Sequence, residues 1–295
     1  MSHSVSGPTE TSELSNLTAD FPDEVDLRLV VADMDGTLLD GQGRVPARFG
    51  TVLTRMREHD VAFVPASGRQ LANLRATLGS AIAESPVIAE NGTIVVQGDD
   101  EIHRETITRS DAVTVVHTTR ALCEQGLDVG PVIATRDRAY VDRIDERFVR
   151  QCAFYYAALE PVEDVLDLAL DNVLKIAVYA FGDAESECYR PLSAAVPGVQ
   201  TVVSGAHWVD MMARTASKGR ALAAVQERLG IEPAQTAVFG DYLNDAELYD
   251  HAELSFAMAN AHPGILSRAR YIAPANTDDG VLRTIETLLD RLSPR

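Results

Sequence analysis

Two carboxylates placed directly after an apolar run are the residues best suited to do chemistry in this chain. Leu29–Ala32 is short, apolar and partly β-branched, which predicts a buried strand of a parallel sheet, and Asp33 and Asp35 follow it. Gly36 allows a tight turn, so both acids can face one pocket at the carboxyl end of the strand, where such sheets bind ligands. Two acids this close repel each other unless a cation or a shared proton offsets their charge. The alternative interpretation is a solvated turn rich in Asp and Gly.

A second group of oxygen ligands follows another apolar run, Thr236–Phe239. Asp241, Asn244 and Asp245 come within a few residues of the end of that predicted strand. Hard oxygen ligands of this kind are what Mg²⁺ prefers, so the segment predicts a metal site. A helix N-terminus rich in Asp and Asn is the alternative interpretation.

Two further segments could bind a phosphate group. Ser67 and Gly68 follow a predicted strand over 61–66, and a hydroxyl with backbone N–H groups ahead of a helix is suited to bind an anion. Lys218 lies close to the start of a predicted helix over 221–229, and a fixed cation among many acids can offset negative charge. The alternatives are an ordinary capping serine followed by a turn glycine, and a surface lysine.

The elements that must position these residues alternate between strands and helices. Apolar spacing predicts helices over 46–58, 71–82 and 281–292, and a third short strand over 87–89. From 93 to about 204 a hairpin signal is followed by predicted helices over 111–125, 161–170 and 185–196, and by predicted strands over 132–135, 174–180 and 200–203. This change predicts an α+β module inserted into an α/β domain. Residues 1–25 are polar and without periodicity, which predicts a disordered tail.

Composition excludes several classes of partner. The 295 residues carry a net charge of -18, which argues against nucleic acid and anionic membranes as partners. No apolar run reaches the roughly 20 residues of a membrane span, and no secretory signal pattern is present. The three cysteines cannot all pair and form no metal motif, which is typical of a reducing cytosol. Dinucleotide-binding and P-loop glycine patterns are absent.

Four segments resemble, in order, the four motifs of the haloacid dehalogenase (HAD) superfamily of phosphohydrolases. They are Asp33–Asp40, Ser67–Arg69, Ala216–Arg220 and Gly240–Asp245. Ser67 stands where many members have threonine, and it keeps the hydroxyl. The tripeptide 90–92 and the long insertion before the third motif resemble the Cof-like branch, subclass IIB.

The resemblance implies a fold and its domains. We expect an α/β fold with a Rossmann-like parallel-sheet core over 26–92 and 205–295. An α+β cap of the C2B type would be inserted over 93–204. The cap carries arginines and tyrosines that could touch substrate, but a solvated face or core packing is the favoured explanation for each of them. The sequence does not single out a specificity loop.

The resemblance also implies roles for the four acids. Asp33 would be the nucleophile and Asp35 the general acid and then the general base. Mg²⁺ would lie on the side chains of Asp33 and Asp241 and on the backbone carbonyl of Asp35. Asp245 would hold the water ligands of the metal.

The remaining predicted site residues would bind phosphate and substrate. Ser67, Gly68 and Lys218 would hold the phosphoryl oxygens. Asn244 would support the phosphate or Lys218. Substrate contacts are predicted for Arg69 and Asn91.

The function implied is Mg²⁺-dependent hydrolysis of small phosphorylated metabolites, sugar phosphates foremost, through an aspartyl-phosphate. A phosphotransferase of the phosphomannomutase type would keep the same acids, and a catalytically silent binding protein could use the same fold. A generic Ca²⁺- or Mg²⁺-binding protein would leave Ser67 and Lys218 unexplained, and no EF-hand spacing is present. We expect a cytoplasmic monomer or homodimer. The sequence does not indicate the substrate.

Overall fold

The computed structural model describes residues 22–293, which fall into two compact units. Residues 22–63 and 231–293 form the first unit, and Val64–Gly230 form the second. Residues 1–21 of the predicted tail lie outside the described residues. Val25, at the end of that tail, pairs with Leu292 in an isolated bridge, so the folded chain already includes this residue.

A parallel sheet organises the first unit, as predicted. Its order is β14-β13-β12-β1-β2, with strands at Tyr271–Ala273, Leu254–Met258, Thr236–Gly240, Leu29–Ala32 and Ala62–Pro65, and the division between the units falls within β2. The strands β1 and β12 pair in parallel, with Ala32 opposite Phe239. Because both strands end at the same edge, the acids that follow them are brought together there.

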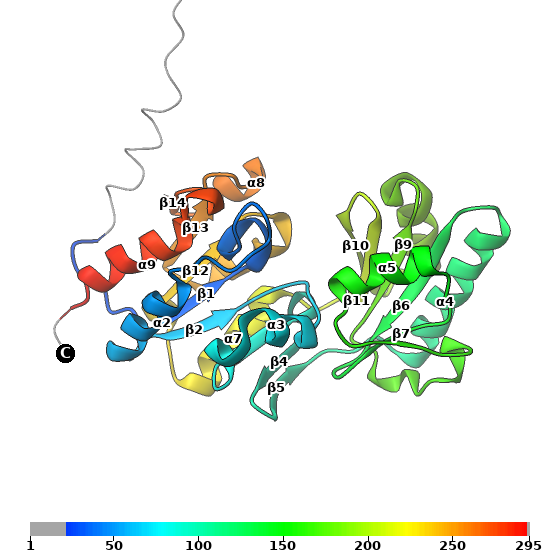
Figure 1. The fold of residues 1–295 in the computed structure, drawn as a ribbon, viewed down its shortest axis with the longest axis horizontal. Helices are drawn as coiled ribbons and strands as arrows, with labels where there is room; N and C mark the ends of the chain where they lie inside the picture. The colour runs from blue at the N-terminus through cyan, green and yellow to red at the C-terminus, as the bar shows by residue number, and fades with distance from the viewer. Residues whose placement is uncertain (1–21, 294–295) are drawn as a thin grey trace, which may run out of the picture. The chain divides into compact units, whose positions relative to one another are not determined.

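Two amphipathic helices pack on each other in the first unit (Figure 1). They are α2 (Phe49–Glu58) and α9 (Gly280–Asp290). The helix α2 buries four apolar side chains at helical spacing, and α9 buries five, as the sequence pattern predicts. The short helix α8 (Pro263–Leu266) follows β13. The helix α9 contacts β14 and the turn Met34–Leu38, which includes Asp35, and α8 contacts β13 and the turn Leu243–Asp245.

The second unit contains two sheets in which most neighbouring strands are antiparallel. A three-stranded sheet is formed by β3 (Pro86–Ala89), β4 (Ile94–Gln97) and β5 (Asp100–Arg104). A six-stranded sheet has the order β10-β11-β9-β6-β7-β8, with strands at Val199–Gly205, Trp208–Ala213, Lys175–Ala180, Val129–Ala134, Ala139–Val141 and Leu159–Pro161. Its pairs are antiparallel except for β7 and β8. The predicted α+β character of this segment is confirmed.

Helices cover both faces of the six-stranded sheet. Ile176 and Val178 pack in one apolar cluster with α4 (Arg109–Glu124) and α6 (Arg190–Ala195). Ala177 and Tyr179, one residue out of phase, pack in another with α5 (Glu146–Tyr155). This alternation along a central strand is the period-2 pattern of a sheet buried on both faces. The helices α3 (Leu71–Leu78) and α7 (Lys218–Leu229) belong to the same unit.

Two local predictions need correction. The predicted helix 161–170 consists of the end of β8 and two 3₁₀ turns, Val165–Asp167 and Leu170–Asn172. The Asp164 carboxylate accepts a hydrogen bond from the N–H of Leu166, a local bond that competes with helix formation. The helix α5 was not predicted, and it buries Phe148 and Cys152 on one face.

One strand of the six-stranded sheet lies beyond the predicted end of the inserted module. Trp208–Ala213 forms β11, which lies between β10 and β9 in the six-stranded sheet. The predicted boundary after residue 204 therefore falls inside the β10–β11 hairpin, in which Val202 lies opposite Asp210. The apolar run 208–212 suits a core strand and a cap strand equally, and only its long-range pairing decides between them. The predicted domain boundaries stay a prediction.

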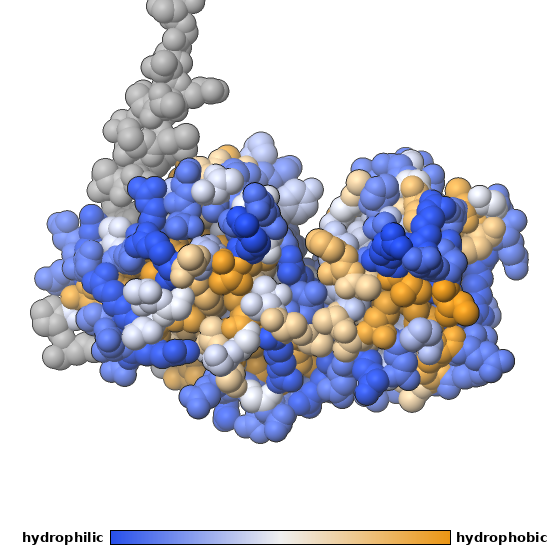
Figure 2. All heavy atoms as spheres, viewed as in Figure 1, coloured by the Kyte–Doolittle hydropathy of each residue, from blue (hydrophilic) through white to orange (hydrophobic). Residues whose placement is uncertain are grey.

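The surface agrees with the composition. Hydrophilic residues cover much of the face drawn in Figure 2, as expected for a chain with a net charge of -18. Among residues 22–293, no helix has both the length and the apolar character that crossing a membrane would need.

Candidate active site

The site in the first unit begins with Asp33, the first residue after β1. Its N–H donates to the carbonyl of Phe239, 3.0 Å away, so the β1–β12 pairing extends into the site. The side chain of Asp33 is buried, whereas that of Asp35 is exposed. Gly36 turns the chain at a φ of 78°, a left-handed conformation that suits glycine.

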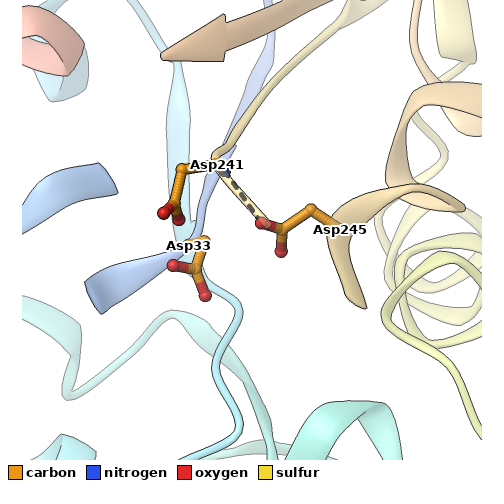
Figure 3. A group of neighbouring side chains, drawn as sticks. All are labelled: Asp33, Asp241 and Asp245. Carbon is orange, nitrogen blue, oxygen red and sulfur yellow. Dashed lines mark hydrogen bonds between the residues drawn. The ribbon is translucent and has the colours of Figure 1, made fainter. Parts of the chain in front are cut away.

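Asp241 and Asp245 complete a cluster of three carboxylates with Asp33 (Figure 3). One oxygen of each acid lies within 4.8 Å of the others. Asp245 is fully buried, and its Oδ2 accepts hydrogen bonds from the N–H groups of Asp241 (3.0 Å) and Tyr242 (3.1 Å). Asp245 therefore also holds the turn that presents Asp241.

A hydrogen-bond network supports the turn that follows β1. Thr37 Oγ1 donates to Asp241 Oδ1 at 3.0 Å. Asn260 Nδ2 donates to the Gly36 carbonyl at 2.8 Å, and Asn260 Oδ1 accepts from the N–H of Asn276 at 3.0 Å. No role was predicted from the sequence for Thr37, Asn260 or Asn276. The two asparagines follow β13 and β14, at the same sheet edge as the acids, which is the signal that could have indicated them.

The chemistry of this donor set fits a hard divalent cation. The three acidic side chains offer only oxygen, the ligand type that suits Mg²⁺ rather than a soft metal. Carboxylates this close repel one another, and a cation offsets that repulsion. Nearby, burial raises the pKa of Tyr249, and the charges of Asp245 and Asp241 raise it further. The Tyr249 phenol therefore stays protonated and donates to the Gly240 carbonyl at 3.1 Å.

Of the predicted phosphate-binding residues, Ser67, Gly68 and Lys218 lie in the second unit and Asn244 lies in the first. Ser67 is buried two residues after the end of β2, and its Oγ accepts a hydrogen bond from the N–H of Arg69 at 3.1 Å. Lys218 is fully buried at the first position of α7, where Ser217 caps the helix by accepting from the N–H of Arg220. A helix start of this kind suits an anion. A buried lysine there is not the surface residue of the alternative interpretation.

A short turn connects these two segments. In the turn Glu90–Gly92 the N–H of Asn91 donates to the Ser67 carbonyl at 2.9 Å. A Cβ on Gly92 would lie 2.3 Å from the Ser217 carbonyl oxygen, so the turn packs directly on the start of α7. Ser67 and Lys218 are thus held by the same three residues.

The structure brings some predicted site residues together and leaves others apart. Asp33, Asp241 and Asp245 form one cluster. Asp35 and Asn244 are close to these acids in the sequence, but both residues are exposed. In the second unit, Ser67, Gly68, Asn91 and Lys218 are grouped around the turn, and Arg69 donates to Asn73 Oδ1 at 3.3 Å. The union of these two groups in one site stays a prediction.

Comparison with known proteins defines the class of this chain. Residues 30–285 match the profile of the haloacid dehalogenase-like hydrolases. A 5-amino-6-(5-phospho-D-ribitylamino)uracil phosphatase of Escherichia coli, YbjI, is 27% identical over 271 residues, which cover 91% of this chain and 98% of the relative. An HMP-PP phosphatase of Citrobacter koseri is 25% identical over 265 residues, covering 83% and 89%.

Solved structures agree on the fold. A protein of Streptococcus mutans superposes with a TM-score of 0.78 at 23% identity, covering 90% of this chain and 99% of that one. A protein of Thermotoga maritima gives a TM-score of 0.75 at 24% identity, covering 91% and 98%. The chain belongs to the haloacid dehalogenase-like hydrolase family. Within it, the chain is a phosphatase of the Cof-like branch.

Proposed function

We propose that the protein is an Mg²⁺-dependent phosphomonoester hydrolase that acts through a phosphorylated Asp33. The observation that carries this proposal is the cluster of Asp33, Asp241 and Asp245 at the ends of two paired parallel strands. A nucleophilic carboxylate beside further carboxylates needs a cation to bring an anionic substrate close.

In the proposed reaction, the Asp33 carboxylate attacks phosphorus and the bond to the leaving oxygen breaks. Asp35 gives its proton to the departing alcohol, so the alcohol leaves neutral. Asp35, now a carboxylate, takes a proton from water, which attacks phosphorus and releases phosphate from Asp33. The exposure of the Asp35 side chain supports this role, because the alcohol and the water both reach it from solvent.

The metal would be held by the carboxylates of Asp33 and Asp241 and, following the family resemblance, by the backbone carbonyl of Asp35. Bound there, Mg²⁺ supplies neutralisation of the phosphoryl charge. Asp245 orients that region through its two backbone hydrogen bonds. For Ser67, Gly68 and Lys218 we propose phosphoryl binding, with Asn244 supporting it and Arg69 and Asn91 contacting the substrate.

The proposed substrates are small phosphorylated metabolites. Sugar phosphates are the first class to test, and the Escherichia coli relative adds compounds in which a phosphorylated ribityl chain carries a heterocycle. A cytoplasmic location and a monomeric or homodimeric state are also proposed.

The test is hydrolysis of p-nitrophenyl phosphate with Mg²⁺ and with EDTA. We expect metal-dependent release of nitrophenol that vanishes in Asp33→Asn and persists in Asp171→Asn, a control that removes an acid with a 71% exposed side chain. Activity of Asp33→Asn near that of the wild type would refute the nucleophile. Transfer of phosphate between hexose phosphates without release to water would instead support the phosphotransferase, and no activity in any assay would support the silent binding protein.

A further inference from the structure

The turn Glu90–Gly92 adopts an unusual backbone. Its three residues have φ angles of 49°, 59° and 91°, all in the left-handed region. Glutamate rarely adopts this conformation, so surrounding contacts must hold it. Such strained segments are concentrated at functional sites, which makes the contacts of this turn informative.

The turn holds both proposed phosphate-binding segments. On one side, the N–H groups of Glu90 and Asn91 donate to the carbonyls of Arg69 (3.0 Å) and Ser67 (2.9 Å). On the other side, Gly92 approaches the backbone just before Lys218 so closely that only glycine fits. A displacement of the turn would therefore change the separation of Ser67 and Lys218.

A buried lysine of the six-stranded sheet holds the turn in place. Lys175, on β9, lies with its Nζ 2.7 Å from Glu90 Oε2 and 3.3 Å from Asp210 Oδ2. The same ammonium donates to the Gly68 carbonyl at 3.0 Å. Asp210, on β11, also accepts from Asn91 Nδ2 at 3.2 Å. Lys175 thus contacts both the turn and Gly68, the residue after Ser67, and Asp210 contacts the turn.

Burial makes the charged groups of Glu90, Lys175 and Asp210 depend strongly on the ion pairs between them. The exposed fractions are 1% for Glu90, 3% for Lys175 and 5% for Asp210. Burial alone would lower the pKa of Lys175, but the charges of Asp210 and Glu90 raise it well above its usual value, so the lysine is charged. Removing Lys175 alone would leave two buried carboxylates without a cation, which is strongly destabilising.

We propose that Lys175 and Asp210 are positioning residues for phosphate binding. They fix the turn Glu90–Gly92, and the turn sets the separation of Ser67 from Lys218. Both positioning residues lie on strands of the six-stranded sheet, so that sheet takes part in shaping the phosphate site. The inference rests on the proposed phosphate-binding role of Ser67 and Lys218.

The experiment measures binding of inorganic phosphate by calorimetry in the presence of Mg²⁺, together with kcat and KM for p-nitrophenyl phosphate. The first variant is Asp210→Asn, which keeps the size of the side chain and leaves the pair of Lys175 and Glu90. The second is Lys175→Met with Glu90→Gln, which removes a cation and an anion together. The control is Val178→Ala, a truncation on the same strand β9 in the apolar core.

We expect phosphate binding to weaken at least about tenfold in the double variant and about threefold or more in Asp210→Asn, as displaced binding groups predict. KM should rise more than kcat falls, and the Mg²⁺ concentration for half-maximal activity should stay unchanged, because the acids lie in the other unit. The control should lower the melting temperature and leave phosphate affinity intact.

Phosphate affinity within twofold of the wild type in folded Asp210→Asn and in the folded double variant would overturn the inference. If the double variant does not fold, Asp210→Asn decides alone. A wild-type protein that binds phosphate but hydrolyses no ester would refute the proposed function while the binding comparison still tests the positioning role. A wild-type protein that binds no phosphate would overturn both.

Discussion

Substitution of Gly36 by alanine tests whether the position of Asp241 controls activity. The new Cβ would lie 2.3 Å from Asp241 Oδ2 and 2.8 Å from its Cγ. Ordinary contact begins at 3.4 Å, so the carboxylate must move by about 1 Å. Thr37 tethers that carboxylate at 3.0 Å, and the movement therefore also strains this hydrogen bond.

Two effects with different readouts follow from Gly36→Ala. The left-handed φ of 78° would lower the free energy of unfolding by about 1–2 kcal/mol, as for any alanine placed there. The displaced carboxylate should lower kcat/KM by about a hundredfold, the loss associated with a 1 Å misplacement of a catalytic group. The Mg²⁺ concentration for half-maximal activity should rise as well, since a ligand has moved.

The matched control is Gly43→Ala. Gly43 has a φ of 72°, and a Cβ there would meet nothing within 4 Å. It carries the same backbone strain without touching Asp241, so it should lose similar stability in urea unfolding and keep its activity. Equal losses of activity in the two variants would show that backbone strain, and not the position of the carboxylate, explains the effect.

Two further predictions concern the second unit. Left-handed strain alone should lower the free energy of unfolding of a Gly→Ala variant by about 1–2 kcal/mol. Gly92→Ala should lose more than this, because its Cβ would lie 2.3 Å from a backbone carbonyl oxygen. Gly98→Ala, with open space around the new Cβ, should lose only that amount, and thermal unfolding of the two variants tests the difference. Burial raises the pKa of Cys152 to about 12 and that of Cys188 to about 11, which keeps both protonated at pH 8. A thiol reagent at pH 8 should therefore modify the exposed Cys123 alone in the folded protein and all three thiols in denaturant; fast reaction of more than one thiol in the folded state would contradict this.

The local part of the site could be predicted from the sequence. Asp33 and Asp241 each follow an apolar strand, and parallel strands end at one edge of a sheet, so their meeting follows from short segments. The same holds for the stripe of α9 and for Lys218 at the start of α7, because helical spacing and capping residues act within a few positions.

Only the tertiary structure decided how distant polar groups pair. Lys175 lies within an apolar strand and Asp210 within an apolar run, and nothing in either segment indicates that both contact the turn at Glu90. The apolar run also could not indicate that β11 joins the six-stranded sheet, because the composition of a strand does not determine which strands it pairs with. Periodicity and capping depend on near neighbours in the chain, whereas ion pairing and strand order depend on which segments are brought together when the chain folds.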